Sequence, residues 1–154
     1  MNLKNMITSA TVITDIRAGT KPEILAELAG RAAILTGLDR MAIFRALLDR
    51  EAASSTGLGL GVAMPQARFK DLRTPAALFA RLGRPVEFHA LDGRPVDLLF
   101  LLLGPEPANA AYLQLLVAAS RALREPAVRE RLRERFDAQS IIAALQDNAA
   151  STSP

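Results

Sequence analysis

The segment Arg50 to Arg68 reads R-E-A-A-S-S-T-G-L-G-L-G-V-A-M-P-Q-A-R, and it decides how the fold of the whole chain is interpreted. Gly57, Gly59 and Gly61 follow two serines and a threonine, and an apolar run then ends at Pro65. Backbone N–H groups of such a glycine-rich loop can converge on one point and form an anion-binding concavity. The alternative is a tight turn that binds no ligand.

Two further stretches extend this pattern. Residues Phe88 to Pro105 read F-H-A-L-D-G-R-P-V-D-L-L-F-L-L-L-G-P, which is a turn, a D-x-x-P-V-D motif and an apolar strand. Residues Ala111 to Gln114 read A-Y-L-Q. Together, the three segments resemble the enzyme IIA proteins of the phosphotransferase system, of the fructose/mannitol type, and especially their nitrogen-regulatory branch. The resemblance spans residues 8–146.

The resemblance implies a phosphoryl-relay domain that lacks its acceptor. In the family, the residue after the proline is the histidine that carries phosphate, and this chain has Gln66 there. A second family histidine, which helps to hold the phosphoryl group, is replaced by Tyr112. We therefore expect no catalytic residue. The expected binding residues are Arg50, Ser55, Thr56, Gly57, Gly59, Gly61 and Gln66, where Arg50 matches an arginine of the family's active site.

The requirements of phosphoryl transfer can be compared with the residues that this chain has. A phosphohistidine relay needs a neutral imidazole nitrogen as nucleophile, together with amide donors and cations that hold the phosphoryl group. The loop amides, the two hydroxyl residues and Arg50 supply the second requirement. Gln66 does not supply the first, because a primary amide does not accept phosphate. It can still donate and accept hydrogen bonds as a neutral imidazole does.

Each of these side chains also has a structural interpretation. Arg50 near a helix C-terminus can simply complement the helix dipole, and Gln66 can be an ordinary exposed loop residue. Tyr112 is expected to pack over the loop rather than act as an acid, because its phenol titrates near 10. The only histidine, His89, can be a relocated acceptor, but no glycine amides surround it in sequence. We expect it to be an exposed turn residue.

Length and composition limit the possible domain organisation, location and metal content of the protein. A chain of 154 residues normally forms one domain, and we expect a single domain over residues 1–147 and a flexible C-terminal tail at 148–154. Cysteine is absent and the N-terminus has no sustained apolar stretch, so we expect a soluble cytoplasmic protein without a signal peptide or membrane segment. One histidine and no cysteine give little support to a metal site, and we expect no cofactor.

The formal net charge is +3, and arginines are concentrated between Arg121 and Arg135. A basic run can bind nucleic acid, but single-strand binders interleave aromatic residues that stack on bases, and this run has none. Glutamates alternate with the arginines around Glu130 and Glu134. We therefore expect a solvated helix face rather than a nucleic-acid site.

The alternation of strand and helix patterns predicts an α/β sandwich, in which helices flank a β-sheet. The resemblance implies that this sheet is mixed rather than purely parallel, as in the mannitol-type enzyme IIA sandwich. Strands are expected at Thr11–Ile16, Pro75–Leu82, Val86–Phe88 and Pro95–Leu103, the last covered on both faces because it is continuously apolar. A helix should begin at a Thr20–Glu23 capping box, bury positions 24, 25, 28, 32 and 35, and end at Gly37. Further helices are expected at about 40–52, 109–124, after Pro126, and at about 138–146.

These observations favour a regulatory domain that works through protein contacts and is not an enzyme. The resemblance implies partners such as a sensor kinase, a potassium-transport component or a histidine phosphocarrier protein. One alternative is an active phosphocarrier that uses another acceptor such as His89. Another is a sensor of phosphate or a similar small anion, which has kept the glycine loop and lost the transfer.

Overall fold

The computed structural model describes residues 7–8 and 11–151, with side chains described up to residue 146. Its centre is a six-stranded sheet in the order β1 (Val12–Ile13), β5 (Ala76–Val86), β6 (Val96–Pro105), β3 (Val62–Ala63) and β2 (Gly57–Gly59). Strand β4 (Gln66–Phe69) also pairs with β6, following β3 along the same edge. Because β6 is antiparallel to β5 and parallel to β3 and β4, the predicted mixed sheet is confirmed.

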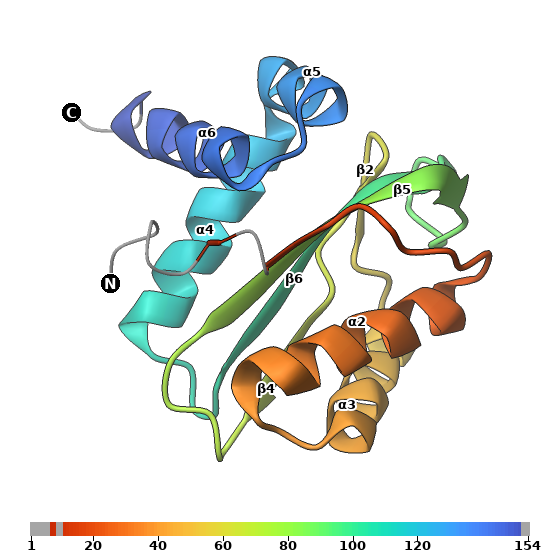
Figure 1. The fold of residues 1–154 in the computed structure, drawn as a ribbon, viewed down its shortest axis with the longest axis vertical. Coiled ribbons are helices and arrows are strands. Elements are labelled where there is room, and N and C mark those ends of the chain that lie inside the picture. The colour runs from red at the N-terminus through yellow and green to blue at the C-terminus, as the bar shows by residue number, and fades with distance from the viewer. Residues whose placement is uncertain (1–6, 9–10, 152–154) are drawn as a thin grey trace.

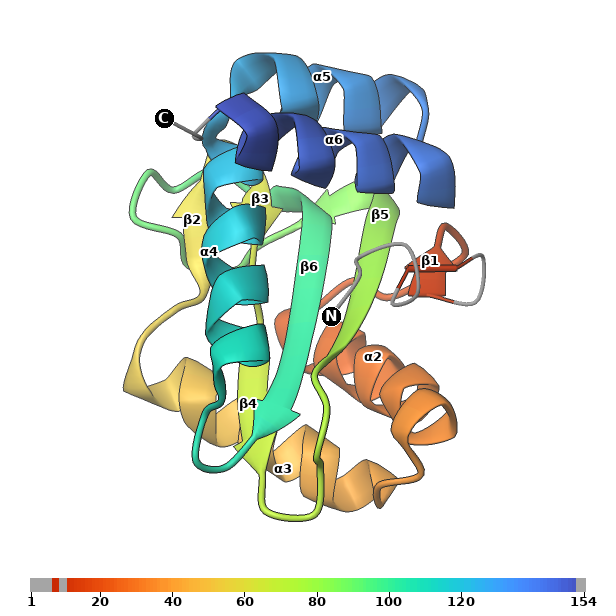
Figure 2. The ribbon, with the colours of Figure 1, turned by 90° about the vertical axis from the view of Figure 1, so that its left-hand side faces the viewer.

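Helices cover both faces of this sheet. Helices α2 (Lys21–Thr36) and α3 (Arg40–Ala53) lie on one side, and α4 (Ala110–Arg124), α5 (Pro126–Glu134) and α6 (Ala138–Ser151) lie on the other (Figures 1 and 2). Strand β6 serves both layers, because successive side chains of a strand point to opposite faces. Leu99, Leu101 and Leu103 belong to the core beneath α2 and α3, and Leu98, Phe100 and Leu102 to the core beneath α4 to α6.

Helix α2 confirms the predicted start and stop signals. The Thr20 hydroxyl donates to the Glu23 carboxylate at 2.8 Å and accepts from the Glu23 N–H at 3.3 Å, so Thr20 caps the helix and Glu23 contacts the cap through the Thr20 hydroxyl. Gly37 ends the helix with φ of 77°, a left-handed conformation that glycine adopts without strain. One core assignment was wrong: Leu35 is 43 % exposed.

Several element boundaries differ from the prediction. Within the described part of the chain, the first strand is shorter than Thr11–Ile16, because Val12 and Ile13 are the residues there that pair with β5. Strand β5 does not stop at Leu82 but continues to Val86 through an irregularity in its pairing with β6. Helix α6 runs to Ser151, so it contains the first residues of the expected tail, and residues 152–154 lie outside the described part. No helix among the described residues is both long and apolar enough to cross a bilayer.

The arginine-rich segment is less solvated than expected. Arg129 is buried and donates to the carbonyls of Leu123 and Arg124 at 2.9 and 2.8 Å, which satisfies the C-terminal end of α4. Arg133 forms an ion pair with Asp97 at 2.8 Å. Alternation with glutamate correctly predicted a helix here, but it did not reveal that Arg129 joins α5 to the end of α4 and that Arg133 joins α5 to β6.

Candidate functional site

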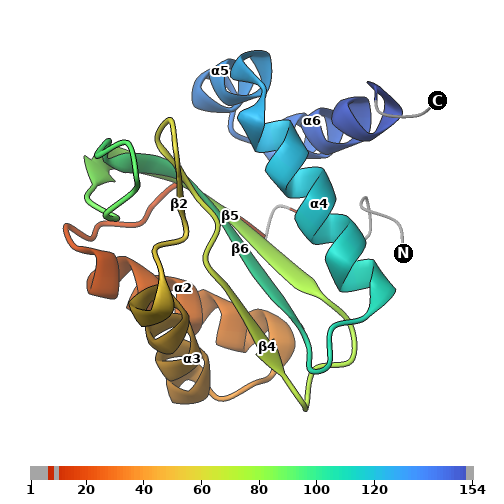
Figure 3. The same ribbon diagram turned by 180° about the vertical axis from the view of Figure 1, so that it is seen from behind.

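A pocket of about 570 Å³ lies where the C-terminal half of α3, strand β4 and the start of α4 meet. Three residues that the sequence analysis singled out, Arg50, Gln66 and Tyr112, line this pocket. The remaining lining residues are Ala46, Asp49, Ala67, Arg68, Glu106, Ala108, Leu113 and Leu116. As Figures 2 and 3 show, α3 and α4 lie on opposite faces of the sheet, and β4 lies at the edge of the sheet between them.

Gln66 is held in place by the backbone and has loose side-chain contacts. Pro65 ends the preceding segment, and its carbonyl accepts from the Leu102 N–H at 3.0 Å, which fixes Gln66 opposite Leu102 in the sheet. The Gln66 amide nitrogen donates to the Met64 carbonyl at 3.4 Å, and its oxygen accepts from the Tyr112 hydroxyl at 3.5 Å. Both distances are at the long end for hydrogen bonds, so these contacts are weak.

Tyr112 closes the pocket from α4. Asn109 caps this helix by accepting from the Tyr112 N–H at 2.9 Å, which sets the tyrosine in the first turn. The ring packs on Gly104, where a Cβ atom would overlap it. Burial raises the pKa of the Tyr112 phenol above its ordinary value, and the positive charges of Arg68 and Arg50 act in the opposite direction. Tyr112 therefore lines the pocket as a neutral hydroxyl, with its ring packed on Gly104 rather than on the glycines of the loop.

Arg50 combines both roles that the sequence left open. Its guanidinium donates to the Ser54 carbonyl at 2.8 Å and to the Ser54 hydroxyl at 3.2 Å, so it satisfies the C-terminal end of α3. It also lines the pocket. Arg68, the second cation, forms an ion pair with Glu106 at 3.4 Å, and both side chains are roughly half exposed. The pocket thus contains two guanidinium groups and two carboxylates, Asp49 and Glu106.

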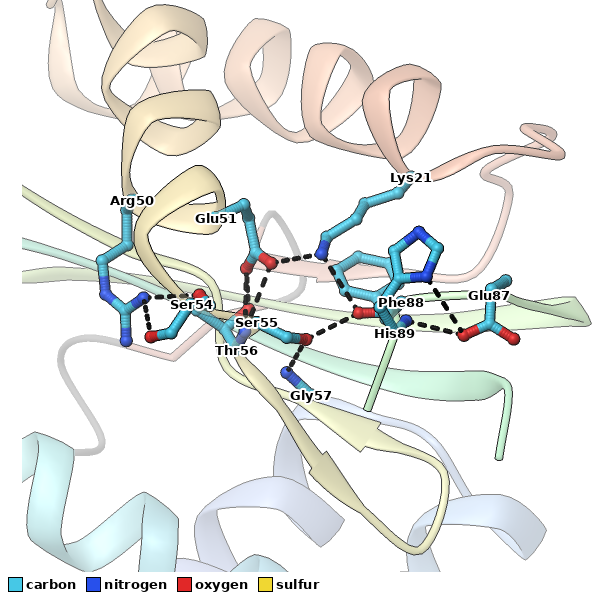
Figure 4. A network of polar contacts seen from close by, with 10 residues as sticks. All are labelled: Lys21, Arg50, Glu51, Ser54, Ser55, Thr56, Gly57, Glu87, Phe88 and His89. Carbon is cyan, nitrogen blue, oxygen red and sulfur yellow. Dashed lines mark hydrogen bonds and ion pairs between the residues drawn. The ribbon is translucent and has the colours of Figure 1, made fainter. Parts of the chain in front are cut away.

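The residues between α3 and β2 take part in a buried polar network rather than in the pocket (Figure 4). Glu51, whose side chain is 6 % exposed, pairs with Lys21 at 2.5 Å and accepts from the Thr56 N–H and hydroxyl. Ser55 donates to the Phe88 carbonyl at 2.6 Å and accepts from the Gly57 N–H at 3.0 Å. The network joins α2, α3, the loop at 54–56 and the segment after β5, and neither Ser55 nor Thr56 lines the pocket.

The glycines shape a β-hairpin. Gly59, Leu60 and Gly61 have φ of 89°, 60° and 82°, so the tip depends on left-handed conformations that suit glycine. Asp92 accepts from the Leu60 N–H at 2.8 Å, and Arg133 donates to the Leu60 carbonyl at 2.9 Å. The expected glycine-lined hollow around Gln66 is therefore corrected: Gly57, Gly59 and Gly61 do not line the pocket, because their hairpin is packed against neighbouring side chains.

His89 lies away from the pocket, as an exposed turn residue. Its side chain is 77 % exposed, and its Nδ1 is 3.9 Å from the Glu87 carboxylate. Arg50 and His89 lie at opposite ends of the network in Figure 4, and His89 is not among the pocket residues. The structure therefore agrees with the exposed-turn interpretation.

Sequence reasoning missed three charged residues of the pocket, namely Asp49, Arg68 and Glu106. A signal existed for Arg68: it follows Gln66 by two residues on β4, and such residues share one face of a strand. Asp49 is adjacent to Arg50 in α3, but its helical position carries no sign of a site. Glu106 lies in the pocket because β4 pairs with the end of β6. This pairing cannot be read from a single sequence.

Comparisons with known proteins agree with this architecture. A family model described as phosphoenolpyruvate-dependent sugar phosphotransferase system, EIIA 2, matches residues 5–148. A nitrogen regulatory protein of Bradyrhizobium diazoefficiens is 40 % identical over 145 residues, covering 94 % of this chain and 95 % of the relative. One from Pseudomonas aeruginosa is 36 % identical over 148 residues and covers 96 % of each. The crystal structure of nitrogen regulatory protein IIA-Ntr from Neisseria meningitidis superposes with a TM-score of 0.82 at 31 % identity, covering 93 % of this chain and 98 % of that one.

Proposed function

We propose that this chain, which belongs to the EIIA 2 family of the phosphoenolpyruvate-dependent sugar phosphotransferase system, acts as a regulatory protein-binding module that accepts no phosphoryl group at position 66. Its nitrogen regulatory relatives make regulation the natural role. In this proposal the protein works in the cytoplasm and behaves permanently like an unphosphorylated family member.

The observation that carries the proposal is the position of Gln66 in the pocket. Its carboxamide nitrogen shares its lone pair with the carbonyl group, so it has no nucleophilic pair for the phosphoryl group that an imidazole would accept. Tyr112 does not replace it, because a phenol is protonated at neutral pH and burial raises the pKa of this one further. His89 lies outside the pocket lining and has no cation or amide cradle among its described contacts.

The protein-binding part rests on the surface beside the pocket. Leu113, Leu116 and Val117 lie at helical spacing on α4, and Leu113 and Leu116 also line the pocket. Leu113 is 49 % and Val117 is 47 % exposed. An exposed apolar stripe next to a pocket with charged residues matches the apolar centre and polar rim of a protein interface. We place the regulatory partner on this face.

A pure small-anion sensor receives less support from the same pocket. Arg50 and Arg68 favour an anion, but Asp49 and Glu106 line the pocket as well. Arg68 already pairs with Glu106, and Arg50 already binds Ser54. A phosphate ion would meet two carboxylates of its own sign, which oppose binding.

A transfer assay tests the first part of the proposal. The protein is incubated with a histidine phosphocarrier protein that carries labelled phosphate, and the products are separated at neutral pH. We expect no label on the chain, and label on position 66 or on His89 would contradict the proposal. The variant Gln66→His provides the matched reference, since it restores an imidazole in the same pocket with Tyr112 unchanged.

A binding assay tests the second part. Unphosphorylated histidine phosphocarrier protein is titrated into the isotopically labelled chain, and NMR shifts are followed. We expect the shifts to cluster at Gln66 and on α4 around Leu113 and Val117, and Leu113→Ser to weaken binding. The control Ile34→Ser changes an apolar side chain that is 85 % exposed on α2, in the other helical layer, and should leave affinity unchanged. Equal losses in both variants would contradict the proposed face.

A further inference from the structure

A second cleft lies at the opposite edge of the sheet from β2, where the segment between β1 and α2 passes the last part of β5 (Figure 1). Its volume is about 450 Å³, and its lining residues are Ile16, Arg17, Ala18, Gly19, Gly83 and Arg84. None of them lines the pocket at Gln66. The cleft is therefore a separate feature, and the proposed function does not use it.

Two exposed arginines, Arg17 and Arg84, line this cleft. Neither Arg17 nor Arg84 has an ion pair or a hydrogen bond from its side chain to any described residue, and both side chains are exposed. No acidic residue lines the cleft. The acids nearest in sequence are already engaged: Asp15 binds Arg31 at 2.9 Å, Glu23 accepts from Thr20 at 2.8 Å, and Glu87 accepts from the His89 N–H at 2.7 Å. Of these three carboxylates, Asp15 is paired with a cation, whereas Glu23 and Glu87 keep their negative charge; none of the three lines the cleft.

The backbone of the cleft leaves room for a ligand. A Cβ atom placed on Gly19 or on Gly83 would meet no atom within 4 Å, so both positions border open space. Gly83 and Arg84 lie in the stretch of β5 where pairing with β6 is irregular, between Arg81 and Val86. Irregularities of this kind turn side chains away from their regular direction, and they occur often beside functional sites. Here the irregular stretch presents Arg84 to the cleft that also contains Arg17.

We propose that this cleft binds a small soluble compound that carries a phosphate group. A guanidinium presents a planar fork of N–H donors that fits two phosphate oxygens at once, and two such forks can hold a dianion from two sides. The open space at both glycines lets the ligand approach the backbone closely. The contrast with the pocket at Gln66 is electrostatic, because that pocket also contains Asp49 and Glu106 and this cleft contains no acid.

Titration with inorganic phosphate and with pyrophosphate tests the proposal. The whole chain is labelled with nitrogen-15, and the guanidinium Nε–H signals of its arginines are followed at low salt and constant pH. We expect saturable shifts at Arg17 and Arg84, with tighter binding of pyrophosphate. Removing both guanidinium groups in Arg17→Ala/Arg84→Ala should weaken binding by about tenfold or more, because hydrogen bonds between charged groups are the strong ones. Arg45→Ala, on the exposed face of α3, is the matched control and should not change the affinity.

Three outcomes would overturn the proposal. The first is the absence of saturable shifts at Arg17 and Arg84. The second is an equal loss of affinity in Arg45→Ala and in the double variant, which would indicate a diffuse effect of net charge. The third is binding only to vesicles that contain anionic phospholipid and not to the soluble phosphates, which would assign the cleft to a membrane surface. A thermal unfolding scan of each variant without ligand verifies that it is folded.

Discussion

The pocket at Gln66 and the hairpin that precedes it are only a few residues apart in the chain, yet they are held in opposite ways. In the pocket, the Gln66 side chain makes two contacts at 3.4 and 3.5 Å, both too long to be strong. In the hairpin, Asp92 and Arg133 both bind Leu60 at less than 3 Å, and the buried Glu51–Lys21 pair fixes the preceding loop. The hairpin and its supporting network therefore depend on many specific contacts, whereas the side chain at position 66 contributes little to the fold.

This difference indicates that the architecture tolerates a change of side chain at position 66, as the proposed loss of the acceptor requires. The contacts that hold the loop come from side chains before and after Gln66, and none of them requires an imidazole at position 66. Substitutions in the hairpin and its supporting network should therefore lower the free energy of unfolding much more than substitutions at position 66.

The largest effect is expected for Glu51→Ala. The substitution removes the partner of Lys21, whose side chain is 13 % exposed, and also the acceptor for the Thr56 N–H and hydroxyl. Breaking a buried ion pair by removing one partner costs about 3–5 kcal/mol. Urea unfolding should show this loss. A loss below about 1 kcal/mol, the range of an exposed ion pair, would mean that the network does not support the loop.

Gly61→Ala should come next. Gly61 has φ of 82°, and a Cβ atom there would lie 2.9 Å from the Asp97 carboxylate and against the Arg133 guanidinium. A left-handed conformation costs a residue with a Cβ atom about 1–3 kcal/mol before the clash is counted, so we expect a loss of about 2–3 kcal/mol in urea unfolding. Gly19→Ala is the control, because nothing lies within 4 Å of its Cβ position. Similar losses for both glycines would contradict the packing assigned to the hairpin tip.

A smaller effect should appear on acidification. The N–H groups of Leu60 and Arg94 hold the pKa of Asp92 below its usual range, with the Leu60 hydrogen bond as the main cause. A carboxylate whose pKa is lowered in the folded state stabilises the protein above its unfolded value of about 3.9 and stops doing so as the pH falls through the folded value. The wild type should therefore lose more stability than Asp92→Asn when the pH falls below about 4. Parallel unfolding curves for the two proteins at pH 5 and pH 3 would argue against this contact.

The smallest effect is expected for Gln66→Ala. Both side-chain contacts of Gln66 are long, so the free energy of unfolding should change by no more than about 0.5 kcal/mol, as for surface substitutions without special contacts. Differential scanning calorimetry can measure this. A loss of about 2 kcal/mol or more is the size expected for a buried hydrogen-bond network. Such a loss would contradict the claim that the Gln66 side chain contributes less to stability than the contacts of the hairpin.

Much of this fold was predictable from the sequence because its signals are local. The Thr20–Glu23 capping box, the left-handed Gly37 and the apolar run of β6 each specify one element through its own residues. The resemblance supplied the mixed sheet and the position of Gln66. The positions of the glycines relative to the pocket were not predictable in the same way. Whether Gly59 and Gly61 face a ligand or Asp92, Asp97 and Arg133 depends on residues 30 to 70 positions away.

The same limit applies to the charges of the pocket. The presence of Arg68 in the pocket could have been predicted, because Arg68 lies on the same face of β4 as Gln66. The presence of Glu106 could not, because it depends on the pairing of β4 with β6. Leu35 illustrates the opposite error. It fits the helical period of α2 and lies near the C-terminal end of the helix, yet it is 43 % exposed, although Ala32 and Leu38 on either side of it contact the core.

The central claim is that the chain occupies its family's scaffold without taking part in the relay. Intact-mass measurement of the native protein, purified at neutral pH from cells grown with an active phosphotransferase system, addresses it most directly. We predict a single species of unmodified mass, whereas Gln66→His expressed in the same cells provides the reference for a restored acceptor. A phosphorylated fraction in the wild-type protein, mapped to position 66 or to His89, would contradict the account.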